Sequence, residues 1–210
     1  MVLNEKKTLL LFTLCFSIIT LFLFYPKESG KRFTINTSHY PTLGDPNASV
    51  HLIVFEEFTC FQCSRFHLED LPQIIEQYVK TNQVKYTSIP SAYLDSSLTP
   101  FRVALAILNQ EQNYYWEFLD FYFSNLTHKK SSLELLGYFS KVHKCFDYEK
   151  ARIFLTGEPP NNELLEIRSA IDKIYKSDIS MPTILINGKL LKKVSLKTIC
   201  AQIDKELENV

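Results

Sequence analysis

Glycine is scarce in this chain, which has 210 residues and only five glycines. Loops that bind phosphate need several glycines close together, because the backbone must approach the phosphate, so a nucleotide site of that kind is not expected. An excess of one charge is also missing, since 23 Lys and Arg balance 23 Asp and Glu. A balanced chain does not indicate binding to nucleic acid. With 46% hydrophobic and 22% charged residues, the composition is that of a globular protein.

Charge is absent altogether from Thr8–Tyr25, an apolar run of 18 residues that follows Lys6 and Lys7. A helix needs about 20 apolar residues to cross a bilayer, and a basic start before an apolar run is also typical of a secretory signal. Large residues stand where a cleavage site would need small ones. We therefore expect residues 1–26 to be a signal peptide or a membrane anchor, and the rest of the chain to lie outside the cytoplasm.

The remainder of the chain alternates between strand-like and helix-like patterns. Residues 27–48 are rich in turn formers and are interpreted as a linker that leads into the domain. The expected elements are a short strand near Phe33–Ile35, a strand at Val50–Phe58, a helix after Cys60 that is kinked or restarted at Pro72, a strand at Val84–Ile89, a helical block at about 97–177, a hairpin of Thr183–Ile186 and Lys189–Leu191, and a helix at Ser195–Leu207. The order predicts one α/β domain over 49–207 with a helical insertion.

Two of the five cysteines share a motif, Cys60-Phe61-Gln62-Cys63, between a predicted strand and a predicted helix. At a helix N-terminus, free backbone N–H groups and the helix dipole stabilise a thiolate, which is the nucleophile of thiol–disulfide exchange. This position should lower the pKa of Cys60, and Cys63, one helical turn further on, can attack a mixed disulfide formed at Cys60. Such a pair favours redox chemistry over a structural metal site.

A proline stands just before the next predicted strand, in Ser180-Met181-Pro182-Thr183. Alone it would mark the edge of a strand. Beside a Cys-x-x-Cys pair it predicts a cis Met181–Pro182 bond whose backbone faces the two sulfur atoms.

At these motifs the chain resembles the DsbA-like form of the thioredoxin fold. The resemblance is carried by segment 40–48, by VHLIVFEEFTCFQC at 50–63, by SMPTILINGKLL at 180–191, and by the helical block around Trp116, which resembles the helical domain inserted in that family. It implies a periplasmic or otherwise extracytoplasmic dithiol–disulfide oxidoreductase with a thioredoxin-like α/β fold. Cys60 would then be the nucleophile, Cys63 the resolving thiol and Pro182 the cis-proline.

The same interpretation names what the protein would work with. Its substrates would be proteins with cysteines or disulfides, and a separate redox partner would reset the cysteine pair. No cofactor or metal is expected, and the membrane would be a partner only if the N-terminal helix, held in the inner membrane, stays uncleaved. Phe61, Gln62 and Met181 are the expected contacts with an extended substrate chain.

The chain departs from the family between its cysteines, where strongly oxidising members carry Pro-His and this chain has Phe61-Gln62. Without that histidine the thiolate is less stabilised and the disulfide is a weaker oxidant, so we expect a reducing or exchange activity. The acid that many members carry six residues before the first cysteine is replaced by Val54. Glu56 and Glu57 remain, and we expect either a proton relay, assigned to Glu57, or a solvated pair at the strand end.

Other residues leave alternatives open. His67 either faces the active site or lies at the surface or in a groove, and Cys145 and Cys200 either form a second disulfide or remain separate thiols. The competing function is a non-catalytic module of the same fold, such as a metal carrier or chaperone that uses the thiols as ligands. A third interpretation is a scaffold with a purely structural disulfide.

Overall fold

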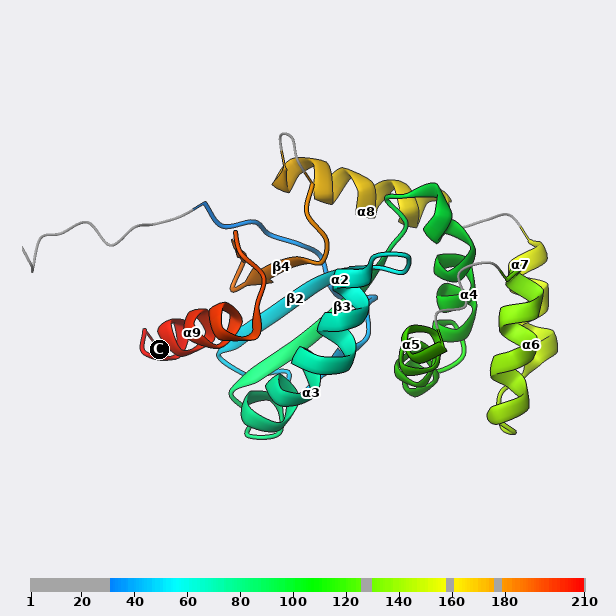
Figure 1. Ribbon diagram of the computed structural model, residues 1–210, viewed down its shortest axis with the longest axis horizontal. Coiled ribbons are helices and arrows are strands. Elements are labelled where there is room, and N and C mark those ends of the chain that lie inside the picture. Colours follow the sequence, from blue (N-terminus) through cyan, green and yellow to red (C-terminus); the bar gives the residue numbers. More distant parts are fainter. Residues whose placement is uncertain (1–30, 126–129, 158–160, 176–178, 210) are drawn as a thin grey trace, which may run out of the picture. The chain divides into compact units, whose positions relative to one another are not determined.

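The computed structural model describes residues 31–125, 130–157, 161–175 and 179–209, and a five-stranded sheet lies at its centre (Figure 1). The strands are β1 (Thr42–Leu43), β2 (Val50–Glu57), β3 (Val84–Ser91), β4 (Thr183–Ile186) and β5 (Lys189–Leu190), in the spatial order β1-β3-β2-β4-β5. The central pair β2 and β3 is parallel, and the other neighbours are antiparallel. The predicted signal or anchor, 1–26, lies outside the described residues. Among the described helices, none is both long and apolar enough to span a membrane.

Most predicted strands are confirmed, and the hairpin turn has the expected chemistry. Asn187 and Gly188 both have positive φ, 47° and 77°, as the two central residues of a type I′ turn require. The strand expected near Phe33–Ile35 is wrong, because only an isolated bridge between Arg32 and Lys189 forms there. The first strand is instead β1, inside the predicted linker, where it pairs with the edge of β3.

The helix after the cysteine motif is irregular around Pro72, as predicted. Four short segments follow one another: α2 (Phe61–Arg65), the π-helical turn η1 (Phe66–Asp70), α3 (Leu71–Ile74) and the π-helical turn η2 (Ile75–Val79). Pro72 stands in the first turn of α3. Pro72 has no N–H to donate, and its ring would collide with the preceding turn of a regular helix. The π-helical turns η1 and η2, which are wider than α-helical turns, flank this point where a regular helix would be broken.

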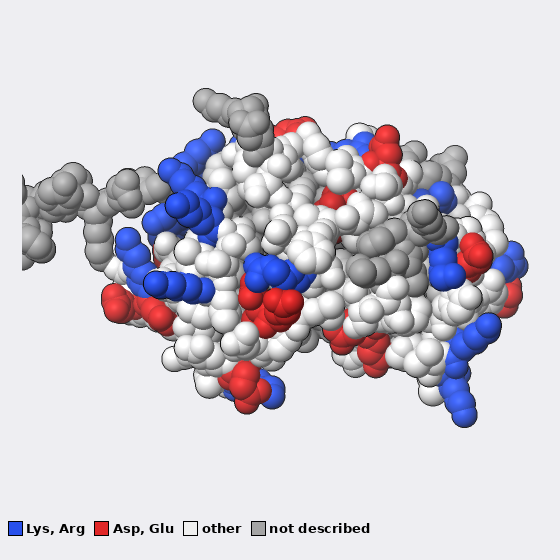
Figure 2. Space-filling view, in the orientation of Figure 1, with Lys and Arg blue, Asp and Glu red and all other residues white. Residues whose placement is uncertain are grey.

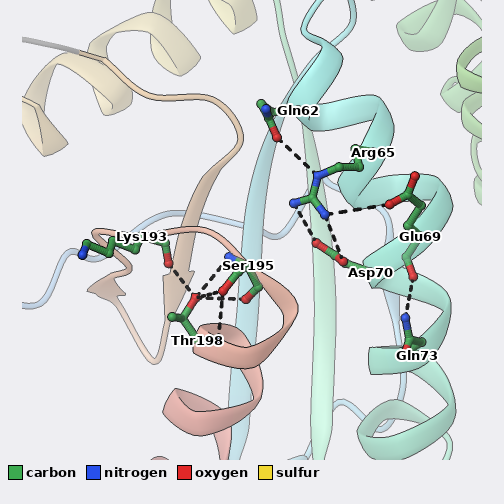
Figure 3. Close-up of polar contacts among 8 residues, drawn as sticks. All are labelled: Gln62, Arg65, Glu69, Asp70, Gln73, Lys193, Ser195 and Thr198. Atoms are coloured by element: carbon green, nitrogen blue, oxygen red, sulfur yellow. Dashed lines mark hydrogen bonds and ion pairs between the residues drawn. The ribbon is translucent and has the colours of Figure 1, made fainter.

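The helical block and the last helix follow the predicted order. A short 3₁₀ turn, η3 (Asp95–Ser97), leads into α4 (Leu98–Leu108), α5 (Gln112–Asn125), α6 (Ser132–Val142), α7 (Tyr148–Thr156) and α8 (Asn161–Ile174), and α9 (Leu196–Leu207) closes the domain. Ser195 caps α9 through a reciprocal pair of hydrogen bonds with Thr198 (Figure 3), a capping box that fixes where the helix begins.

The two faces of the sheet have different covers. Along β2, Leu52 and Val54 belong to a core cluster with α3 and α9, whereas Ile53 and Phe55 belong to a cluster with α4–α8. This is the alternation expected of neighbouring strand residues. The segments η1, α3 and η2 together with α9 therefore cover one face, and the inserted helices α4–α8 cover the other (Figure 1). The end of β2 thus emerges between the two covers.

Candidate active site at the end of β2

The cysteine motif lies where β2 passes into α2. Cys60 is the N-cap residue of α2 and has an extended backbone, with φ −88° and ψ 119°. The backbone N–H groups of Cys63 and Ser64 both donate to the Cys60 carbonyl oxygen at 3.1 Å, so the first turn of the helix closes directly after Cys60. Cys60 is partly exposed and Cys63 is fully buried.

The two thiols are held in opposite electrostatic states. A hydrogen bond from the Cys63 thiol, with further ones from the backbone N–H groups of Cys63 and Gln62, lowers the pKa of Cys60 to about 6, although partial burial opposes this. Burial raises the pKa of Cys63 well above its usual range, and the bond to Cys60 adds to that rise. At neutral pH Cys60 is therefore largely a thiolate and Cys63 a thiol.

The segment with the cis-proline lies against the nucleophile. The Met181–Pro182 bond is cis, as predicted, and the Cys60 Sγ atom is 3.6 Å from the carbonyl oxygen of Met181. Thr183 holds this turn, because its hydroxyl donates to the carbonyl oxygen of Ser180 at 2.9 Å. The structure thus brings Cys60, Cys63 and Pro182 into one site.

The residues expected to contact substrate differ in how exposed their side chains are and in whether those side chains are already hydrogen-bonded. Phe61 is 72% exposed, and Met181 is partly buried beside Cys60. Gln62 is exposed but turned toward the helix, where its side-chain oxygen accepts a hydrogen bond from Arg65 Nε at 3.3 Å (Figure 3). Arg65 in turn pairs with Asp70 at 3.2 Å. Figure 2 shows charged groups of both signs on the face in view, with several Lys and Arg side chains gathered at its left. Phe61 offers an exposed apolar ring next to the nucleophile.

The two glutamates at the end of β2 are not a solvated pair, because both are fully buried. The Glu57 carboxylate accepts the backbone N–H of Tyr93 at 2.9 Å and the hydroxyl of Ser91 at 3.2 Å, and burial raises its pKa. The Glu56 carboxylate accepts the hydroxyl of Tyr86. Burial and the interactions with Cys60 are the larger causes of the raised pKa of Cys63, and the charge of Glu56 adds to them. Glu57 as a proton relay stays a prediction.

His67 is buried, with 5% of its surface exposed, so a surface position is wrong, whereas a groove position agrees with its place in the lining of a cavity of about 450 Å³ beside Trp116. Its Nε2 atom is 2.8 Å from Asp120 Oδ1 on α5, and its Nδ1 atom is 3.5 Å from Glu56 Oε2. Burial lowers the pKa of His67, but the two carboxylates raise it by more than burial lowers it, so the pKa is about 9. Sequence reasoning missed Asp120, and the only signal for His67 was its place one helical turn after Cys63.

The remaining described cysteines lie apart from the site. Cys145 is exposed, Cys200 is partly buried, and both are free thiols. Within the described ranges no group of three metal-binding side chains occurs.

Comparisons with known proteins agree with this geometry. A family model described as thioredoxin matches residues 36–205. The chain is 25% identical over 192 residues to a probable disulfide bond formation protein D of Bacillus anthracis, which covers 87% of this chain and 84% of that protein. Among solved structures it is similar to oxidised BdbD from Bacillus subtilis (20% identity, TM-score 0.74, 85% of this chain and 98% of that one). It is also similar to DsbA from Chlamydia trachomatis (19% identity, TM-score 0.73, 86% and 97%).

Proposed function

The chain belongs to the thioredoxin family, and from this premise we propose that it is a protein dithiol–disulfide oxidoreductase. The observation that carries the proposal is the asymmetry of the cysteine pair. A partly exposed thiol with a pKa of about 6 is three residues from a fully buried thiol whose pKa is raised. This is the arrangement that exchange needs, because the first sulfur must attack as a thiolate and the second must wait until a mixed disulfide has formed.

The steps follow from this asymmetry. The Cys60 thiolate attacks one sulfur of a substrate disulfide, the substrate S–S bond breaks, and one substrate sulfur leaves as a thiolate that takes a proton from solvent. Cys63 then loses its proton and attacks Cys60 Sγ, which releases the second substrate sulfur and leaves a Cys60–Cys63 disulfide. The substrate is reduced by two electrons and the protein is oxidised by two. The reverse sequence transfers a disulfide to a substrate dithiol.

The direction we propose is reduction or exchange rather than strong oxidation. A lower pKa of the nucleophile stabilises the reduced form and makes the disulfide a stronger oxidant. The pKa of about 6 for Cys60 is closer to the value of about 7 for thioredoxin than to about 3.5 for strongly oxidising DsbA. Phe61 and Gln62 bring no positive charge that would lower it further.

The substrates in this proposal are polypeptides, and the place of action is outside the cytoplasm. The exposed Phe61 ring and the partly buried Met181 beside Cys60 offer apolar contacts to an extended chain. The uncharged run Thr8–Tyr25 supports export, either with a cleaved signal or with an anchor in the inner membrane. A separate partner must reset the redox state of the pair, since each exchange leaves the pair changed by two electrons.

The test is the equilibrium redox potential of the full chain, titrated against glutathione and dithiothreitol, with Cys60→Ser as the control. We expect a reversible two-electron couple at about −200 to −270 mV, the range spanned by glutaredoxins and thioredoxin. A value near −120 mV would overturn the direction and leave the exchange activity standing. A titration curve that does not differ from that of Cys60→Ser, with a metal ion bound by both thiols, would overturn the enzyme and favour the binding module.

A further inference from the structure

Helix α6 (Ser132–Val142) exposes large apolar side chains on the side that faces away from the core. Leu133 is 46% exposed, Tyr138 45% and Val142 66%. The opposite side of the helix is buried, where Phe139 packs against aromatic rings of α5. α6 contacts α4 and α7 and is drawn at the outer edge of the inserted helices in Figure 1. Three exposed apolar side chains on one short helix indicate a surface that meets a protein partner.

A glycine stands in the middle of this exposed side. Glycine weakens a helix relative to alanine, so a glycine inside a helix calls for a reason. The backbone of Gly137 does not have a positive φ, and a Cβ atom at this position would meet nothing within 4 Å. Neither the backbone nor the packing of the described chain therefore requires a glycine here. What Gly137 leaves is open space on the outer side of α6.

The charges of this side are arranged so that the helix complements itself. Glu134 and Lys141 are both exposed and stand seven residues apart, which places them two turns apart on one line along the helix. Their midpoint lies between Gly137 and Tyr138. A second α6, rotated by half a turn about that midpoint, would run antiparallel and bring each Glu134 opposite Lys141 of the other copy. Hydrogen bonds from Ser131 lower the pKa of Glu134, so its carboxylate is charged at neutral pH.

The same rotation pairs the other exposed side chains. Leu133 and Val142 are equally far from the midpoint and would lie side by side. Gly137 and Tyr138 flank the midpoint, so the Tyr138 ring of each copy would enter the open space over Gly137 of the other. The Lys141 ammonium lies 5.3 Å from the centre of the Tyr138 ring of its own chain, so the charged and the aromatic side chain share one face. A two-fold interface requires such self-matching, because every contact between two positions occurs twice.

We propose that α6 is the interface of a homodimer, in which two copies pack α6 against α6 in antiparallel directions about a two-fold axis between Gly137 and Tyr138. The occupant is a second copy because acid matches base, apolar matches apolar and glycine matches ring between positions of one and the same helix. The dimer is independent of the proposed exchange activity, since the cysteine pair is not part of this face. One helix buries less than the roughly 1,200–2,000 Å² of stable complexes, so we expect a weak dimer with a dissociation constant of about 10–100 µM.

Cross-linking between introduced thiols tests the register of the two helices. The full chain, with all five native cysteines replaced by serine, is prepared once as Glu134→Cys and once as Lys141→Cys, and the two are mixed near the expected dissociation constant. With a copper oxidant, the mixture should form disulfide-linked dimers at least about tenfold faster than either variant alone. In the mixture the two thiols face each other. In either variant alone they lie about 10 Å apart along the helix axis, beyond the reach of a disulfide.

The matched control mixes Lys141→Cys with Glu76→Cys in the same background. Glu76 is on η2 and its side chain is 73% exposed, so this mixture reports random collision. Both mixtures carry the same apolar run, Thr8–Tyr25, and association through that run would affect them equally. Equal rates of cross-linking in the two mixtures would overturn the proposed pairing.

Substitution of the glycine separates the dimer from the fold. Gly137→Gln adds a side chain where the chain itself leaves room and removes a residue that weakens the helix, so the melting temperature should not fall. The added side chain fills the space that the Tyr138 ring of the second copy would take, and the dissociation constant measured by sedimentation should rise at least about tenfold. Lys150→Gln, at an exposed position of α7, should leave it unchanged. An unchanged constant in Gly137→Gln would contradict a two-fold axis at this position.

The charge pair gives an effect of known sign. Lys141→Glu puts two carboxylates opposite each other and should weaken the dimer at least about tenfold at low salt. Adding Glu134→Gln to that variant removes the repulsion and keeps a capping residue at the start of α6, so it should restore most of the lost affinity. A parent chain that stays monomeric about tenfold above the expected dissociation constant would overturn the homodimer. Charge variants that associate as well as the parent would also overturn it.

Discussion

The two ends of the cysteine motif, three residues apart, are built for opposite purposes. Around Cys60 the chain offers backbone N–H groups, a neighbouring thiol and access from outside, and the pKa falls to about 6. Around Cys63 it offers full burial and the nearby charge of Glu56, and the pKa rises. The difference shows that the helix N-terminus alone does not set the reactivity of such a pair. The burial of the second thiol does as much, because it keeps that thiol protonated and able to donate to the first.

The largest effect should come from removing one thiol at a time. Cys60→Ser should abolish disulfide exchange, because the remaining thiol is fully buried and protonated. Cys63→Ser should keep the first attack and stop there, so that substrate proteins accumulate as mixed disulfides with Cys60. Non-reducing electrophoresis with a disulfide-containing protein substrate distinguishes the two. Adducts formed equally well by both variants would mean that the two ends of the motif are equivalent.

The second effect concerns the interaction between the thiols. The hydrogen bond from Cys63 is the largest cause of the low pKa of Cys60. In Cys63→Ala that donor is lost, and we expect the pKa of Cys60 to rise by about one to two units, toward its usual value of about 9. The ultraviolet absorbance of the thiolate, followed against pH, measures this. A pKa that stays near 6 in the variant would assign the shift to the helix N-terminus alone.

The third effect is a dependence of stability on pH that only the reduced protein should show. The pKa of Cys60 is lower in the folded reduced chain than its usual value of about 9. Its contribution to stability is therefore fully present above the unfolded pKa and is lost as the pH falls through about 6. We expect the melting temperature of the reduced form, relative to that of the disulfide form, to increase from pH 5 to pH 8. A difference that is flat over this range would contradict the lowered pKa.

The parts of this site that were predictable are those that local sequence dictates. Cys60 and Cys63 follow a strand and open a helix, and Pro182 precedes a strand, so each is visible within a few residues. The burial of Glu56 was not predictable, because a charged residue at a strand end is usually solvated. The contact of Glu56 with His67 was not predictable either, because His67 is held in turn by Asp120, a residue far along the chain. Contacts of that range depend on how the inserted helices pack against α2 and η1, the helical segments that follow Cys60.

The fold divides in the same way. The hairpin at Asn187-Gly188 and the irregular helix at Pro72 were predictable, since a turn type and a missing N–H act locally. Strand β1 was not predictable, because two residues have no pattern of their own. Thr42 is held by residues far along the chain: it pairs with β3, its hydroxyl contacts Thr87 at 2.8 Å, and the side-chain amide of Gln112 bonds its backbone N–H and carbonyl oxygen at 3.1 Å.

The smallest expected effect tests the exposed side of the comparison. Phe61 is 72% exposed and directly follows the nucleophile, so truncating it removes apolar contact with substrate and leaves the helix and both thiols in place. In Phe61→Ala we expect the KM for an unfolded protein substrate to rise by about two- to fivefold, equivalent to about 0.4–1 kcal/mol of lost contact. The rate with glutathione disulfide, too small to cover the ring, should stay within about twofold. Steady-state kinetics with the two substrates measures this, and equal losses with both would indicate that Phe61 acts on the thiolate rather than on the substrate chain.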